Sequence, residues 1–142
     1  MPVIRAVMDT NVLVSAARSR RGASNALLAE LRVGRWRIVL SNHLLLEYEE
    51  VLKRESGALS QTLADIDGLL DSLCAAAELV HVRSPWRLHL SDPDDEMLVQ
   101  LAVESGANLI TTHNIRDLTP AAGVGVRVLR PLEFLNLIRT SS

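Results

Sequence analysis

Acidic side chains recur along this chain at points where apolar segments end. Asp9 follows the apolar run 3–8, Glu47 lies a few residues after a second apolar run, and Asp92 opens an acidic run over residues 92–96. Asp117 follows a further apolar run. Carboxylates that gather without a cation raise one another's pKa and destabilise a fold, whereas carboxylate oxygens are ligands that suit Mg²⁺ and Mn²⁺. If these groups meet at one place, they predict metal-assisted hydrolysis of a phosphodiester.

Each of these acidic positions also has a purely structural interpretation. Asp9 and Asp92 are of a residue type that caps helices, and acidic residues in a first helical turn each contribute about 0.3–1 kcal/mol through the helix dipole. Glu47 lies on one flank of the apolar arc of its helix and Glu49 on the other, so the periodicity does not choose between them. Asp117 fits an ordinary loop. Capping explains only part of the acidic run, because four acidic residues in five positions exceed what a cap needs.

The segments that place these residues alternate between strand and helix patterns. Short apolar runs predict strands, and apolar residues at three- and four-residue spacing predict helices. Apolar strands linked by helices imply a mainly parallel sheet covered on both faces, a three-layer α/β/α sandwich. Leu63 and Leu132 are among the residues expected to face the core. The expected strands span residues 3–8, 37–40, 79–82, 108–111 and 126–129, and the expected helices begin near residues 24, 42, 60, 93 and 131.

A parallel sheet also indicates where a functional site should lie. Ligands of such folds bind beyond the carboxyl ends of the strands. The polar groups at those positions are Asp9, the turn 41–43, the acidic run that begins at Asp92, and residues 112–114. We therefore expect these groups to lie together at one edge of the sheet.

Length and composition exclude several classes of protein. The 142 residues suit one domain spanning 1–142, and 48% hydrophobic with 23% charged residues is the balance of a folded chain, not a disordered one. A net charge of −2 excludes nucleic-acid binding through bulk positive charge, and 3% aromatic residues exclude a platform for stacking bases. The single cysteine excludes a disulfide framework. Because no apolar run approaches the length of a membrane span or of a signal-peptide core, we expect a cytoplasmic protein without membrane contact.

Four ordered segments make the chain resemble a PIN domain, of the kind found as the toxin of bacterial toxin–antitoxin systems. The matching segments are residues 6–15, 39–52, 92–107 and 109–118. An Asp-Thr-Asn sequence after a strand is common by chance, but the ordered set of four segments is specific. The resemblance implies an α/β/α fold and a metal-dependent ribonuclease.

Carried over by position, the resemblance also implies a set of site residues. Asp9, Glu47 and Asp95 are the implied ligands of Mg²⁺ or Mn²⁺, which selects one of the two flanking glutamates and one residue of the acidic run. Asn114 stands where many members carry Asp and brings no charge, so Asp117 is the candidate for the fourth acidic role. The implied catalytic residues are Asp9, Glu47, Asp95 and Asp117, and the implied substrate-binding residues are Thr10, Asn11, Thr112 and Asn114.

The resemblance further implies an RNA substrate, a small antitoxin protein as partner, and a homodimer. Two alternatives stay open. Asn114 motivates a PIN scaffold that binds RNA or a protein without catalysis. Phosphoryl transfer through Asp9 is less well supported, because dehalogenase-like phosphatases usually carry a second aspartate where this chain has Asn11. Response-regulator receivers need a lysine at a strand end, whereas Lys53, the only lysine, lies within a predicted helix.

Basic and histidine residues have minor roles in this prediction. A short loop near the first predicted helix is basic, and its residues are expected to be solvated or to contact RNA phosphate or a partner. The arginines of that loop are Arg18, Arg20 and Arg21. His43, His81 and His89 show no metal-ligand spacing, and His113 is expected to be a loop histidine beside the site.

Overall fold

Five parallel strands form one sheet in the computed structural model, which describes residues 3–83, 90 and 92–141. The strands are β1 (Ile4–Met8), β2 (Trp36–Leu40), β3 (Glu78–Leu79), β4 (Leu109–Thr111) and β5 (Arg127–Leu129). Their order across the sheet is β3-β2-β1-β4-β5. The register places Ile4 opposite Trp36 and Val7 opposite Ile110. The parallel sheet predicted from the apolar runs is confirmed.

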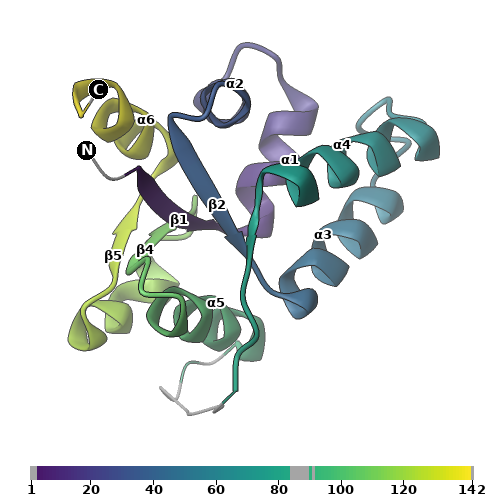
Figure 1. Ribbon diagram of the computed structural model, residues 1–142. Coiled ribbons are helices and arrows are strands. Elements are labelled where there is room, and N and C mark those ends of the chain that lie inside the picture. The colour runs from purple at the N-terminus through teal and green to yellow at the C-terminus, as the bar shows by residue number, and fades with distance from the viewer. Residues whose placement is uncertain (1–2, 84–89, 91, 142) are drawn as a thin grey trace.

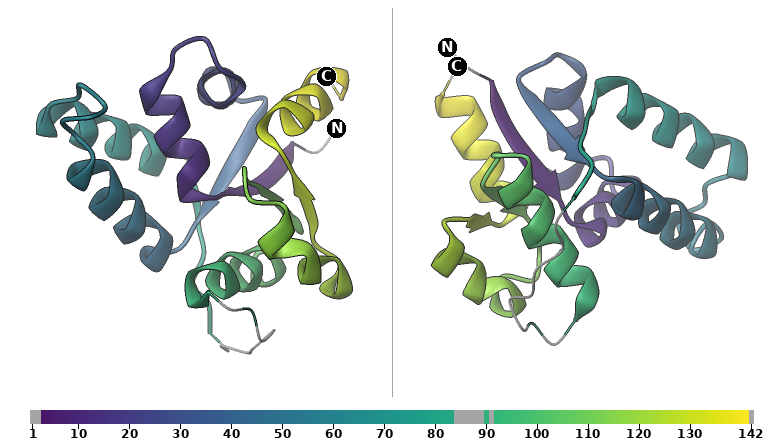
Figure 2. Two further views of the ribbon diagram at one scale, coloured as in Figure 1. Left: turned by 180° about the vertical axis from the view of Figure 1, so that it is seen from behind. Right: turned by 60° about the horizontal axis from the view of Figure 1, so that its bottom comes forward.

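Helices cover both faces of this sheet (Figures 1 and 2). They are α1 (Thr10–Arg18), α2 (Ala23–Arg32), α3 (Asn42–Arg54), α4 (Leu63–Ala76), α5 (Pro93–Glu104), the 3₁₀ helix η1 (Arg116–Val124) and α6 (Pro131–Thr140). On one face α2 packs against both α1 and α6, whereas α5 and η1 lie on the other face. The helices α3 and α4 pack against each other on the β2 side. This is the three-layer α/β/α arrangement that the sequence predicted.

Burial of apolar side chains holds these layers together. Residues 6–8 of β1 are 0% exposed, as expected for a strand with a neighbour on each edge and helices on both faces. Trp36 of β2 is also fully buried, and its indole N–H donates to the carbonyl of Leu27 at 2.8 Å. The same ring packs edge-on against Phe134, with ring centroids 5.1 Å apart. These contacts fix β2, α2 and α6 to one another.

The strand order creates a crevice between β1 and β4. The chain adds β2 and β3 on one side of β1 and then returns to add β4 and β5 on the other side. Such a reversal opens a crevice beyond the carboxyl ends of the two strands that flank it. Asp9 follows β1, and its backbone N–H donates to the carbonyl of Thr111 at the end of β4, at 2.9 Å. Asp9 therefore lies at the crevice, as the sequence predicted.

Side-chain caps determine where the helices around the crevice begin. Ser41 caps α3 and Asp92 caps α5, each through a side-chain oxygen that accepts from a backbone N–H. The prediction for α4 is wrong by one turn: this helix begins at Leu63, because Thr62 caps it and exchanges hydrogen bonds with Asp65. Leu63, expected to face the core, is 58% exposed.

The helix α1 is absent from the prediction. Its β-branched residues Val12 and Val14 lower the intrinsic helix propensity of the segment. Burial of one face against the rest of the molecule outweighs that cost, since Val12, Leu13 and Ala16 are all buried. Arg18 consequently belongs to the last turn of α1 and not to the basic loop expected there.

Three smaller expectations also differ from the structure. Leu132 is 59% exposed, because the inner face of α6 is formed by Phe134, Leu135 and Ile138. The strand expected over residues 79–82 is the short β3, and Asp117 lies in η1 instead of a loop. Among the residues described, no helix combines the length and apolar character needed to cross a bilayer.

Candidate active site

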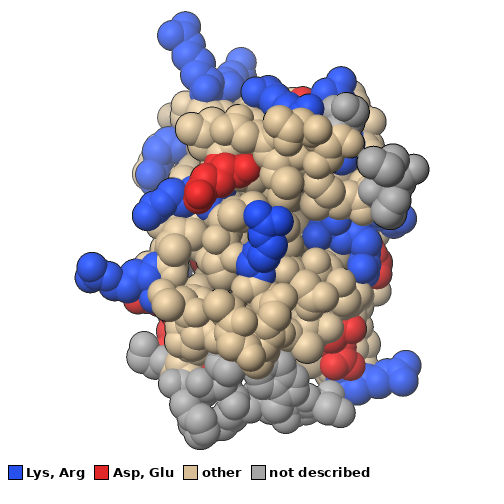
Figure 3. All heavy atoms as spheres, turned by 90° about the vertical axis from the view of Figure 1, so that its left-hand side faces the viewer, with Lys and Arg blue, Asp and Glu red and all other residues tan. Residues whose placement is uncertain are grey.

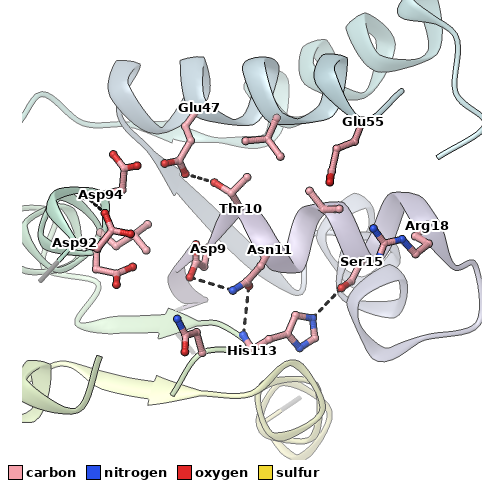
Figure 4. A pocket seen from close by; sticks show the side chains of 15 residues that line it. Asp9, Thr10, Asn11, Ser15, Arg18, Glu47, Glu55, Asp92, Asp94 and His113 are labelled. Carbon is pink, nitrogen blue, oxygen red and sulfur yellow. Dashed lines mark hydrogen bonds between the residues drawn. The ribbon is translucent and has the colours of Figure 1, made fainter. Parts of the chain in front are cut away.

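A pocket of about 480 Å³ lies at the crevice, with α1 and α3 as its long walls (Figure 4). Residues that follow the two central strands, Asp9 and Asn114 among them, contribute to its floor. The acidic residues that line it are Asp9, Glu47, Glu55, Asp92, Asp94 and Asp95. Carboxylates from three separate parts of the sequence therefore meet in one place, which is the juxtaposition that the parallel topology predicted.

Asp9 is held in the pocket by neutral hydrogen-bond donors. Thr112 donates its hydroxyl to Oδ2 of Asp9 at 2.8 Å, and Asn11 donates its side-chain N–H to the same oxygen at 3.4 Å. Burial raises the pKa of Asp9, although the bonds from Thr112 and from the backbone of Thr10 and Asn11 act in the opposite direction. The Asp9 carboxylate is thus oriented, but in the described chain no Lys or Arg side chain pairs with it to neutralise its charge.

Thr112 and Asn114 connect Asp9 to the segment after β4. Thr112 is fully buried and does not itself line the pocket. While it donates to Asp9, its hydroxyl accepts the backbone N–H of Asn114 at 2.9 Å. Asn114 does line the pocket, and its amide N–H donates to Oδ2 of Asp117 at 2.6 Å. Because its N–H is engaged by Asp117, the side chain of Asn114 offers its amide oxygen to the pocket as an acceptor.

The structure distinguishes the two glutamates that the helical pattern left equivalent. Glu47 lines the pocket and accepts a hydrogen bond from the hydroxyl of Thr10 on α1. Glu49 lies outside the pocket lining and pairs with Lys53 at 3.4 Å. Burial, and after it the neighbouring Asp94, raises the pKa of Glu47. The packing of α3 beside α1 therefore directs Glu47 toward Asp9.

Asp95 is the residue of the pocket whose carboxyl pKa is shifted most from its ordinary value. It lies in the first turn of α5, where Asp92 caps the helix by accepting the backbone N–H of Asp94 at 2.9 Å. Burial, followed by the charges of Asp92, Asp9, Asp117 and Asp94, raises the pKa of Asp95 to about 6. Asp117 is exposed on η1 and does not line the pocket, but it is close enough to contribute to this shift.

The donor set fits a divalent cation. In the described part of the chain, no Lys or Arg forms an ion pair with Asp9, Glu47 or Asp95. Their carboxylates share one pocket with the amide oxygen of Asn114, and hard oxygen donors of this kind suit Mg²⁺ and Mn²⁺. A cation would also offset the burial and, after it, the mutual repulsion that raise the pKa values of these acids.

A histidine that the sequence prediction set aside lies at the edge of this cluster. His43, Glu47 and Asp94 each offer a ligand atom within 4.8 Å of the others, and Nε2 of His43 is 3.2 Å from Oδ1 of Asp94. The expectation that His43 has no metal-ligand spacing is therefore wrong. The four-residue separation of His43 and Glu47 is the signal that would have found it, because it places both on one face of a helix. His89 lies outside the described residues.

The basic residues are not gathered in the same way. On the face that is on the left in Figure 1, Lys and Arg side chains are spread over the surface, several of them along its upper edge, and fewer acidic side chains are visible (Figure 3). The chain carries 15 basic and 17 acidic residues in total. Since the overall balance is nearly even, the concentration of six acids around one pocket is a local feature.

A family model matches most of the chain. The family model described as "PIN domain" matches residues 5–116, which include Asp9, Glu47, Asp95 and Asn114. A search of curated proteins finds no match to the chain. PIN domains are in general nucleases, and the acidic pocket at the β1–β4 crevice is consistent with that chemistry. Because the matched region covers most of its length, the chain belongs to the PIN-domain family.

Proposed function

We propose that the protein is a metal-dependent endoribonuclease that hydrolyses phosphodiester bonds of RNA. The observation that carries the proposal is the gathering of Asp9, Glu47 and Asp95 in one pocket without ion pairs to Lys or Arg in the described chain. Metal-assisted phosphodiester hydrolysis uses a cation that is held by hard oxygen ligands beside the phosphate. Family membership supports the same reaction class.

Each side chain of the pocket has a distinct task in this mechanism. Asp9, Glu47 and Asp95 would hold Mg²⁺ or Mn²⁺. The bound ion supplies Lewis acidity, which promotes attack of water on phosphorus and offsets the developing negative charge. Thr112 orients Asp9, and Thr10 orients Glu47, through the hydroxyl bonds described above.

The remaining polar residues act on the substrate side of the pocket. Asn11 lines the pocket and is fixed by its bond to Asp9. Asn114 presents an amide where the family usually carries an acid, and its bond to Asp117 places a fourth carboxylate just outside the lining. In this proposal Asn114 contacts a phosphate or a water. The negative charge of Asp117 helps to raise the pKa of Asp95 and so affects how much negative charge the centre carries.

We also propose the biological setting that the family resemblance suggests. The protein would be the toxin of a toxin–antitoxin pair, act in the cytoplasm on RNA, form a homodimer and bind a small antitoxin. Size-exclusion chromatography with light scattering tests the dimer. Growth arrest on expression of the wild-type chain, but not of an Asp9→Asn variant, tests the toxin role.

The alternative is a PIN scaffold that binds RNA or a protein without cleaving it. Asn114 favours this alternative, because it leaves the fourth position uncharged. Titration with Mn²⁺ separates the two functions, since a scaffold needs no tight cation binding that depends on Asp9.

RNA cleavage by the purified protein tests the main proposal. We expect cleavage with Mn²⁺ or Mg²⁺, none with EDTA, and none by the Asp9→Asn variant. Glu50→Gln is a matched control, because Glu50 is exposed on α3 and outside the pocket lining. Cleavage by a folded Asp9→Asn variant at the wild-type rate, or equal cleavage in EDTA, contradicts the assignment.

A further inference from the structure

The pocket continues beyond its acidic centre as a groove between α1 and α3. Successive turns of the two helices contribute residues to its lining. At the acidic end, Thr10 is hydrogen-bonded to Glu47. One turn further the lining residues are Val14 and Val51, and two turns further they are Arg18 and Glu55. Because a helix rises 1.5 Å per residue, the groove extends about 12 Å from the acidic end.

The middle of this groove is apolar. Val14 is 8% exposed and Val51 is half-buried, and both line the pocket from opposite helices. Aliphatic walls cannot hydrogen-bond a phosphate, but they suit the flat face of a nucleobase. The groove therefore changes character within about one helical turn of the acidic centre, from a site for charge to a site for a planar apolar group.

The far end of the groove carries two opposite charges that do not pair with each other. Figure 4 shows Glu55 pointing from α3 and Arg18 lying at the end of α1, both away from the acidic centre. Within the described chain, neither side chain forms a hydrogen bond or an ion pair. Glu55 thus presents two free acceptor oxygens, and Arg18 presents a fork of N–H donors.

We propose that this end of the groove binds a guanine of the RNA, next to the bond that is cut; the inference rests on the proposed nuclease function. Guanine has two adjacent donors, N1–H and the 2-amino group, that match the two oxygens of Glu55. Its O6 and N7 are acceptors that suit a guanidinium such as Arg18. Adenine, cytosine and uracil each present a single donor position on that edge, so they leave one oxygen of Glu55 without a partner.

A polar pair lies between the guanine site and the acidic centre. Ser15 Oγ and His113 Nε2 are 2.9 Å apart, and both residues line the pocket. The backbone N–H of His113 donates to the side-chain oxygen of Asn11 at 3.3 Å, which ties this pair to the Asp9 end. The ribose and phosphate that join the guanine to the cleaved bond would run over these groups.

Titration with mononucleotides in EDTA tests the guanine site directly. The probes are GMP, IMP, AMP, CMP and UMP, with binding followed by the methyl NMR signals of Val14 and Val51. All five carry the same phosphate, so differences report the base alone. We expect GMP to bind about tenfold or more tightly than AMP, CMP and UMP, as for a bidentate base contact. IMP, which lacks the 2-amino group but keeps N1–H, O6 and N7, should bind more weakly than GMP and more tightly than AMP.

Substitutions at the far end should remove the preference for guanine. We expect Glu55→Gln to abolish most of it, and Arg18→Gln to weaken GMP binding. The matched controls, which remove the same charge outside this pocket, are Glu50→Gln on α3 and Arg32→Gln in the last turn of α2. Both controls should bind GMP as the wild-type protein does.

Equal binding of the five nucleotides, or a preference for GMP that persists in Glu55→Gln, overturns the inference. This readout requires neither a metal nor cleavage, so failure to hydrolyse RNA counts against the nuclease proposal alone. Cleavage sites mapped in a random RNA pool give the converse test. If the wild-type protein cleaves RNA but no guanine recurs at a fixed distance from the cut, the nuclease proposal stands and the guanine site is overturned.

Discussion

Replacing Asp95 with Asn should stabilise the metal-free protein near neutral pH, although it removes a proposed ligand. Burial and neighbouring acids raise the pKa of Asp95 from 3.8 to about 6. A shift of that size corresponds to about 3 kcal/mol, and because the side chain is partly exposed we expect roughly half of it. The variant also loses a helix-dipole interaction in the first turn of α5, about 0.5 kcal/mol. The net gain is about 1 kcal/mol, or about 2–5 °C in Tm.

The sign of this effect depends on pH in a defined way. The folded protein retains the Asp95 proton up to about pH 6, whereas the unfolded chain releases it near 3.8. The stability associated with the protonated form is therefore complete below the unfolded value and is lost as pH rises through the folded one. The advantage of the Asp95→Asn variant should be largest at about pH 7 and shrink steadily toward about pH 4.

Thermal unfolding in EDTA, followed by circular dichroism, measures this difference. Asp71→Asn is the matched control, because Asp71 is exposed on α4 and outside the pocket lining. Addition of Mn²⁺ should raise the Tm of the wild-type protein more than that of Asp95→Asn, since a cation stabilises the state that binds it. A variant that melts below the wild type at neutral pH in EDTA, or an advantage that does not change with pH, would refute the electrostatic reasoning.

Three further substitutions test the groups around the centre. Tyr48→Phe removes the hydroxyl that donates to the carbonyl of Met8, so urea unfolding should give a free energy lower by about 1–2 kcal/mol; an unchanged value contradicts this. Thr112→Val removes a hydrogen-bond donor to Asp9, so the pKa of Asp9 should rise. Mn²⁺ affinity measured by calorimetry should then fall most at low pH, where protons compete with the cation, and an equal loss at every pH contradicts this. His43→Asn removes the imidazole beside the acids, so Zn²⁺ affinity should fall more than Mg²⁺ affinity; equal losses argue against coordination.

The strands and the acidic edge of the sheet were predictable because they depend on local pattern. An apolar run followed by Asp9 is readable without tertiary information, and a parallel sheet brings such strand ends together. The cap at Asp92 is equally local, since its side chain accepts from the backbone N–H of Asp94, two residues along the chain. These features required no knowledge of which helix lies beside which.

Features that depend on packing between distant segments were not predictable. The propensity of Val12 and Val14 argues against α1, and only the buried inner face of that helix outweighs it. The choice of Glu47 over Glu49 depends on α1 lying beside α3, where Thr10 reaches Glu47. Periodicity could not show it, because both glutamates are equally placed on the arc of their own helix.

The way the carboxylates are held explains why the site can accept a cation. Thr112 fixes Asp9 and Thr10 fixes Glu47 through neutral hydroxyls, each bond to a charged group contributing about 1.5–3 kcal/mol. An arginine or lysine in those places would hold the acids as firmly but would cancel their charge, and a cation would have to displace it. Neutral donors orient the carboxylates without cancelling their charge, so burial and, after it, the neighbouring acids raise the pKa of Asp95 to about 6. Burial and repulsion of the acids lower the stability of the metal-free fold, and a bound cation that relieves this penalty stabilises the fold by binding to it.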